Sequence, residues 1–99
     1  MPEEESTLTI NENGDKYWRN KKDKLHRIDG PAIEYVEGTN QWYQNGVLHR
    51  IDGHAIEYRN GDKSWFYNNL KFHTKEAFFE ALNDEEKKIA LFSEDFLNA

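Results

Sequence analysis

Two histidine–arginine pairs, each followed by an aspartate, are the residues whose types and spacing could carry chemistry in this chain. A histidine near a carboxylate can act as a general base, and histidine with aspartate can ligate a metal ion. His73, further along the chain, is another candidate of this kind. The six residues of the two sets are His26, Arg27, Asp29, His49, Arg50 and Asp52.

These sets recur within the chain, and repetition changes their interpretation. Residues 25–30 and 48–53 both read LHRIDG, and residues 32–35 and 55–58 both read AIEY, a constant spacing of 23. An active site needs one asymmetric constellation, whereas the joint of a repeat must occur in every unit. We therefore expect His and Arg to bond to the next hairpin and Asp to close its own turn. Metal binding generated by the repeat, and catalysis, are the alternatives; we assign no catalytic, cofactor or metal residues and expect a non-enzyme.

The elements that position these residues read as β-hairpins. Gly-x-x-x-Trp occurs three times, at residues 14–18, 38–42 and 61–65, and apolar residues alternate with Glu34 and Glu57 in the two AIEY blocks. This alternation is typical of half-buried strands, and the glycines and asparagines between them are typical of tight turns. The fold class we predict is mainly β, α+β overall: an antiparallel meander of hairpin repeats.

The two ends of the chain differ from the repeats. Leu8 and Ile10 alternate with threonines and predict a first strand. After His73 we expect one or two helices, with Thr74 as an N-cap and Asn83 and Glu86 as a capping box. Two apolar stripes are expected to face inward, namely Phe78, Phe79 and Leu82, then Ile89, Phe92 and Phe96. The predicted organisation is residues 1–13 as acidic N-terminus and first strand, 14–73 as repeats and 74–99 as a helical cap.

Two neighbouring columns of the repeat have different expected roles. Trp18, Trp42 and Trp65 are expected to form an aromatic spine. If strands alternate, the next column points the other way, and its rings are either an interaction surface or the surface on which the helices pack. A lysine cluster in the first unit is either a solvated hairpin tip or a nucleic-acid contact. The candidate partner-binding residues are Arg19, Tyr43, Phe66, Lys21, Lys22 and Lys24.

Composition limits the class of partner and the cellular compartment that we expect. Residues 1–12 hold four acidic and no basic residues, and residues 75–99 hold seven acidic residues against three lysines, within a formal net charge of −6. This distribution disfavours nucleic acid, because such binders normally show a basic face. The chain has no cysteine, and MPEEES lacks the features of a signal peptide. We expect a cytoplasmic protein without a membrane contact.

The stretch HRIDGPAIEYVEGTNQWYQNG resembles the MORN-like repeats of short bacterial and phage proteins, written HR-x-DGPA, a glycine turn and W-x-x-NG. The resemblance covers residues 14–73. His54 stands where the first unit has Pro31, and Asn69 where it has Gly46, which indicates a boundary unit at the end of the array. Related repeats belong to antitoxins of toxin–antitoxin systems and to uncharacterised phage proteins. Lipid binding by eukaryotic MORN repeats transfers poorly, because their Tyr-x-Gly pattern differs.

The resemblance implies a β-hairpin scaffold that binds proteins. The function we expect is a non-catalytic binding module, of phage or bacterial type, that inhibits or neutralises a partner protein in the (host) cytoplasm. The alternatives are a structural protein that self-associates through its sheet edge, giving a homo-oligomer, and a nucleic-acid-binding or nucleic-acid-mimicking protein.

Overall fold

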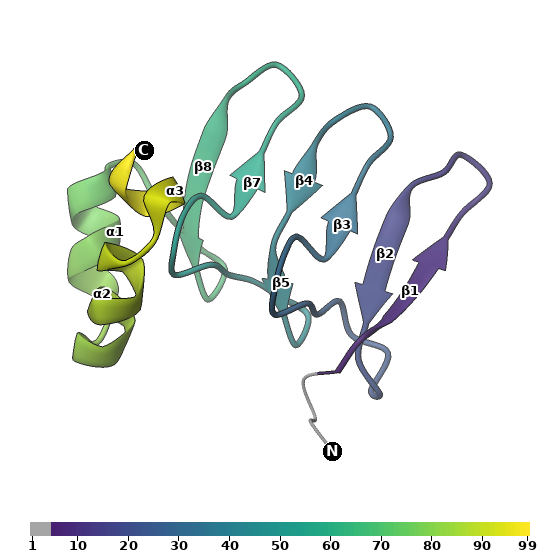
Figure 1. Cartoon of the computed structure of the whole chain (residues 1–99), viewed down its shortest axis with the longest axis horizontal. Helices are drawn as coiled ribbons and strands as arrows, with labels where there is room; N and C mark the ends of the chain where they lie inside the picture. Colours follow the sequence, from purple (N-terminus) through teal and green to yellow (C-terminus); the bar gives the residue numbers. More distant parts are fainter. Residues whose placement is uncertain (1–4) are drawn as a thin grey trace.

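A computed structural model describes residues 5–99 as one antiparallel sheet with helices at one end (Figure 1). The sheet has seven strands in the order β1-β2-β3-β4-β7-β8-β9, and a separate two-stranded hairpin pairs β5 with β6. The strands are β1 (Thr7–Ile10), β2 (Lys16–Arg19), β3 (Ile33–Glu34), β4 (Asn40–Gln41), β5 (Tyr43–Gln44), β6 (Val47–Leu48), β7 (Ile56–Glu57), β8 (Lys63–Tyr67) and β9 (Leu70–Phe72). The predicted mainly β meander with C-terminal helices is confirmed.

The hairpin turns form where the sequence places residues that accept a positive φ. Asn45 and Gly46 connect β5 to β6 with φ of 52° and 82°, and Asn68 and Asn69 connect β8 to β9 with φ of 50° and 69°. Two successive positive φ angles match the twist of a two-residue hairpin. Asn69 adopts the conformation of Gly46, because asparagine tolerates the left-handed region.

Hydrogen bonds also join successive hairpins at the turns between β1 and β2, β3 and β4, and β7 and β8. The Asp15 carboxylate accepts a hydrogen bond from the Val36 backbone N–H (2.9 Å), and the Thr39 hydroxyl accepts one from the Arg59 N–H (3.1 Å). Each bond spans 20 or 21 residues. These bonds fix the lateral spacing of the hairpins at one edge of the array.

Three short helices follow the last strand, α1 (Lys75–Ala81), α2 (Asp84–Leu91) and α3 (Glu94–Leu97). Thr74 caps α1 through the Ala77 N–H, and the Asn83–Glu86 capping box of α2 forms as predicted. In Figure 1 they lie together beside β8, at the far end of the sheet from β1. Within residues 5–99 no helix is long and apolar enough to cross a bilayer.

The largest apolar cluster lies between the helices and the last hairpin. Its buried members are Trp65, Phe78, Leu82, Ala90 and Phe96. Trp65 stacks on Phe78 with centroids 4.7 Å apart and meets Phe96 edge-on at 5.9 Å.

The predicted second stripe is wrong. Phe92 is 90% exposed and Ile89 is 51% exposed, whereas Phe96 is 4% exposed. The helix on which the stripe was placed ends at Leu91, and Ser93 caps a separate helix. A break between Phe92 and Phe96 changes the direction of the chain, so that a spacing of i, i+3, i+7 no longer describes one face.

The predicted boundary after residue 13 falls in the turn between β1 and β2. These strands pair over four residues on each side, from Thr7 opposite Arg19 to Ile10 opposite Lys16. The first strand is therefore part of the same sheet as the repeats. Residues 1–4 of the predicted acidic N-terminus lie outside the described residues.

Candidate functional site

Each repeated histidine joins one hairpin to the next. The His26 Nδ1 accepts a hydrogen bond from the Asn45 backbone N–H (2.9 Å), and the His49 Nδ1 accepts the equivalent bond from Asn68 (3.0 Å). The ring nitrogen that accepts must be unprotonated, so both imidazoles are held as the Nε2–H tautomer. The bond gives His26 and His49 a structural role and occupies the Nδ1 lone pair that a metal ion would need.

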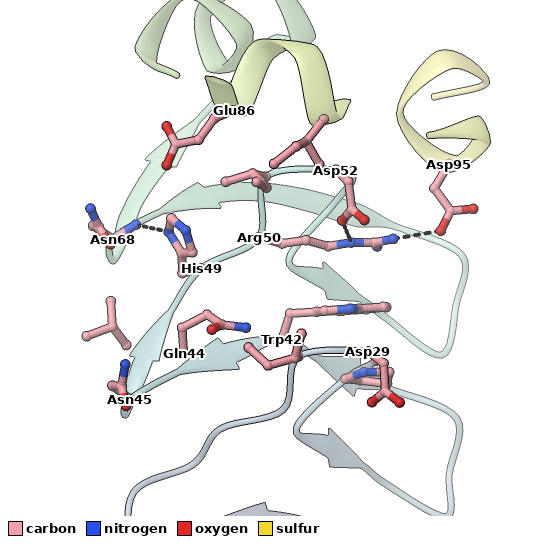
Figure 2. A pocket seen from close by; sticks show the side chains of 16 residues that line it. Asp29, Trp42, Gln44, Asn45, His49, Arg50, Asp52, Asn68, Glu86 and Asp95 are labelled. Atoms are coloured by element: carbon pink, nitrogen blue, oxygen red, sulfur yellow. Dashed lines mark hydrogen bonds and ion pairs between the residues drawn. The ribbon is translucent and has the colours of Figure 1, made fainter. Parts of the chain in front are cut away.

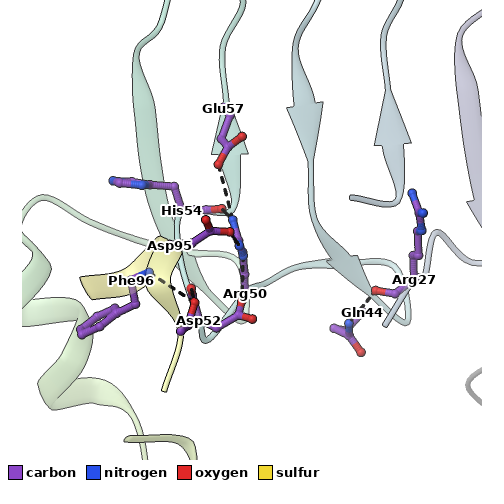
Figure 3. Close-up of polar contacts among 9 residues, drawn as sticks. Arg27, Gln44, Arg50, Asp52, His54, Glu57, Asp95 and Phe96 are labelled. Atoms are coloured by element: carbon purple, nitrogen blue, oxygen red, sulfur yellow. Dashed lines mark hydrogen bonds and ion pairs between the residues drawn. The ribbon is translucent and has the colours of Figure 1, made fainter. Parts of the chain in front are cut away.

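The side chain of each repeated arginine closes the loop that follows it, as Figure 3 shows for Arg50, whereas the arginine backbone N–H bonds to the next hairpin. Arg27 donates from Nε to Asp29 (3.2 Å) and from Nη1 to the Pro31 carbonyl (3.1 Å) and the Glu34 carboxylate (3.0 Å). Its guanidinium lies 3.8 Å from the centre of the Trp18 ring. Such stacking contributes about 0.5–2 kcal/mol, and the planar fork lets one side chain hold a turn and a strand at once.

Glycine follows each aspartate because the guanidinium lies against the backbone there. A Cβ at Gly30 would come within 2.9 Å of the Arg27 Cζ, and a Cβ at Gly53 within 2.6 Å of the Arg50 Cζ. These approaches are shorter than carbon–carbon contact, so any side chain would displace the arginine. The R-x-D-G sequence therefore acts as one unit: the aspartate pairs with the arginine, and the glycine leaves the space that the guanidinium occupies.

Arg50 makes the same contacts as Arg27 and one more. It lies 4.1 Å from the Trp42 ring centre and donates to Asp52 (2.8 Å) and to the His54 carbonyl (2.9 Å). Its Nη2 also donates to Asp95 of α3 at 2.6 Å. The Arg50 side chain is 6% exposed and that of Arg27 is 22% exposed. Among residues 5–99 no acidic side chain contacts Arg27 as Asp95 contacts Arg50.

The remaining histidines occupy different surroundings. His73 is exposed, and His54 lies against Trp65 with ring centroids 3.9 Å apart. Burial, with the nearby charges of Lys63, Arg50 and Lys75, lowers the pKa of His54 to about 4. Burial also lowers the pKa of His49, although the Glu86 carboxylate opposes this shift. Within the described part of the chain no three His, Asp or Glu side chains come close enough together to hold a metal ion.

A groove of about 870 Å³ opens beside Trp42 (Figure 2). One wall is the loop of the first unit, residues 28–31, and the other wall is formed by side chains from α2 and α3. Between the walls lie Trp42, the second hairpin and the second loop. The lining residues are Ile28, Asp29, Gly30, Pro31, Trp42, Gln44, Asn45, Val47, His49, Arg50, Ile51, Asp52, Asn68, Glu86, Ile89 and Asp95.

None of the six candidate partner-binding residues lines this groove. Tyr43 and Phe66 are half-buried in strands, and their carbonyls accept the Arg27 and Arg50 backbone N–H groups. The helices pack on Trp65 of the tryptophan column, and Phe66 is not part of that cluster. The three lysines, Lys21, Lys22 and Lys24, are exposed at the turn after β2, where Arg19 pairs with Asp23 at 3.9 Å. They remain predictions for a separate surface.

Sequence reasoning named several lining residues in other roles, Asp29, His49, Arg50 and Asp52 as joints and Trp42 in the aromatic spine, but it did not predict the groove. Ile28 is 57% exposed and Ile89 is 51% exposed, although their types suggested core. A signal was available in the differences between the units, since Gln44 stands where the next unit has Tyr67, and His49 where it has Phe72. Gln44 and His49 are more polar than Tyr67 and Phe72, which indicates that the helices do not cover the surface around Gln44 and His49 as they cover the last hairpin.

Comparison of the chain with protein-family models, with curated proteins and with solved structures gave no match.

Proposed function

We propose that this protein is a non-catalytic binding module that uses its hairpin repeats as a scaffold and the groove beside Trp42 to hold a partner protein. The resemblance to MORN-like repeats supports this proposal, and so do the structural roles of the repeated polar residues. Binding of a partner would inhibit or neutralise it, in the cytoplasm of a bacterial cell or of a phage host.

The observation that carries the proposal is the groove itself. Its lining combines an accessible tryptophan, exposed aliphatic side chains and the amides of Gln44, Asn45 and Asn68. Aromatic anchors with satisfied but reachable polar groups are typical of protein interfaces. The side chains of the repeated histidines join the hairpins and those of the repeated arginines close their loops, which favours binding over catalysis.

Affinity purification tests this function directly. The tagged full chain is used to capture proteins from bacterial lysate, and any enriched protein is purified and titrated against the chain by calorimetry. A binder with micromolar or tighter affinity whose own activity falls on binding supports the proposal. Enrichment no greater than with empty resin, in lysates of several hosts, would contradict it.

A second function, self-assembly, is favoured by the first strand. All four residues of β1 are exposed, and within residues 5–99 β1 ends the sheet with β2 as its one neighbour. An unpaired edge with alternating Thr and aliphatic residues can pair with another chain. Light scattering at increasing concentration measures this association, and replacing Thr9 by Pro should abolish it. A monomer at every concentration would rule out this function.

A further inference from the structure

The groove is the first-unit copy of the surface on which the chain's own helices pack in the second unit. Ile51 packs against the helical cluster, and the Asp52 carbonyl accepts a hydrogen bond from the Ser93 hydroxyl (2.8 Å). The equivalent residues one repeat earlier, Ile28 and Asp29, line the groove beside them, and Ile28 is 57% exposed. The same backbone therefore presents the same docking loop twice, and the described helices cover it once.

The spacing of the repeat leaves room for a helix at the uncovered loop. Adjacent units are two strands apart, which corresponds to about 10 Å because neighbouring strands lie about 4.8 Å apart. Packed helices lie 8–10 Å apart. A helix seated on the first unit would thus lie beside α2 and α3 at the distance of ordinary helix packing, touching Ile89 and Trp42.

The charges of the groove select the kind of helix. Four carboxylates line it, with Arg50 as the basic partner, and Arg50 already bonds two of them, Asp52 and Asp95. The Asp29 carboxylate pairs with Arg27 (3.2 Å) but remains 87% exposed. Glu86 accepts a hydrogen bond from the Tyr67 hydroxyl (2.9 Å) and has no ion pair within residues 5–99, so four carboxylates face two arginines. The uncompensated charge is negative, which disfavours phosphate backbones and attracts lysine and arginine.

We propose that the groove binds a short basic amphipathic helix of a partner protein, with its apolar side on Trp42, Ile28 and Ile89 and its basic side chains beside Asp29 and Glu86. This inference rests on the proposed binding function and adds the chemical class of the partner. The stems of lysine and arginine would cover the aliphatic rim while their charged ends reach the carboxylates.

The test uses the full chain and a synthetic helical peptide of about 14 residues made of Leu, Ala and Lys, since shorter helices are marginal in water. We expect saturable binding by fluorescence titration and amide shifts at the Trp42 indole N–H and the Gln44 and Asn45 side chains. The same peptide with Gln in place of every Lys should bind at least tenfold more weakly. Equal binding of the two peptides, or shifts confined to other residues, would overturn the proposal.

Two pairs of variants separate the groove from general charge and hydrophobicity. Asp29→Asn should weaken peptide binding about threefold to fivefold. Its control, Asp23→Asn, should leave binding unchanged, since Asp23 is similarly exposed (91%), lies near an arginine (3.9 Å) and does not line the groove. Ile28→Ser should weaken it about fivefold to tenfold, and the equally exposed Ile10→Ser should not. Thermal melts establish that each variant is folded.

The outcomes also separate this inference from the proposed function. A captured partner that is neither displaced by the Lys peptide nor bound more weakly by the Ile28→Ser variant would support the binding function. That result would overturn the proposal that the groove binds a basic helix. Absence of both a captured partner and peptide binding would contradict both.

Discussion

Replacing Arg50 by alanine should destabilise the fold more than replacing Arg27, although the two arginines occupy equivalent positions of the repeat. Arg50 stacks on Trp42, bonds a backbone carbonyl and donates to two carboxylates, one of them on α3. The stack contributes about 1 kcal/mol, the carbonyl bond about 1 kcal/mol and each partly exposed carboxylate about 0.5–1 kcal/mol. The expected loss for Arg50→Ala is therefore about 3–4 kcal/mol.

Arg27 lacks the bond to α3 and is more exposed, so its neighbours can be solvated when it is removed. The Trp18 stack, the Pro31 carbonyl bond and the two carboxylates of Arg27, Asp29 and Glu34, sum to about 3 kcal/mol on the same scale. Because the Arg27 side chain is 22% exposed and that of Asp29 is 87% exposed, solvent screening lowers the expected loss for Arg27→Ala to about 2 kcal/mol. Urea denaturation followed by tryptophan fluorescence measures both values. With a slope of about 1.5–2 kcal/mol per molar, the midpoint should fall by about 2 M for Arg50→Ala and by about 1 M for Arg27→Ala.

The exposed Arg59, for which no ion pair is present within residues 5–99, supplies the control, and Arg59→Ala should change stability by less than about 0.5 kcal/mol. If Arg27→Ala costs as much as Arg50→Ala, the bond to α3 adds nothing and the stated reasoning fails. A double variant of Arg50 and Asp95 measures the coupling of the sheet to the helix directly.

Three further predictions concern other contacts. Gly53→Ala should cost about 1–3 kcal/mol in the same urea titration, because its Cβ displaces Arg50; a neutral result would mean that the loop moves freely. Stability should fall as the pH drops from 6.5 toward 4, because the lowered pKa of His54 means that the unfolded chain takes up the proton first. His54→Pro, which restores the first-unit residue, should reduce the fall of the melting temperature between pH 6.5 and 4. If the melting temperature of the variant falls as steeply as that of the parent chain, another group causes the effect. Phe96→Ala should cost about 3–5 kcal/mol and Phe92→Ser less than about 0.5 kcal/mol, the opposite ranking being evidence for the single stripe.

The local architecture followed from the sequence because its signals are local. The turns at Asn45-Gly46 and the capping box at Asn83 depend on residues a few positions apart, and the spacing of 23 fixes which strands are equivalent. The roles of the histidines also followed from repetition alone, since a contact needed by every unit must be written in every unit.

The groove could not be predicted from the sequence, because its position depends on where the C-terminal helices end. The one local signal near Phe92 is Ser93, an N-cap residue type followed by Glu94 and Asp95. The apolar spacing of Ile89, Phe92 and Phe96 favours a continuous helix instead, so the sequence carries conflicting signals there. Only the packed structure places Asp95 on Arg50 and leaves Ile28 exposed.

The sequence by itself thus determined the repeat, its hairpins and its joints, all of which rest on short-range chemistry that recurs. The tertiary structure decided which copy of the docking surface the helices cover. That choice depends on contacts between residues about 41–45 positions apart, such as Ser93 with Asp52 and Asp95 with Arg50, and no local pattern encodes them.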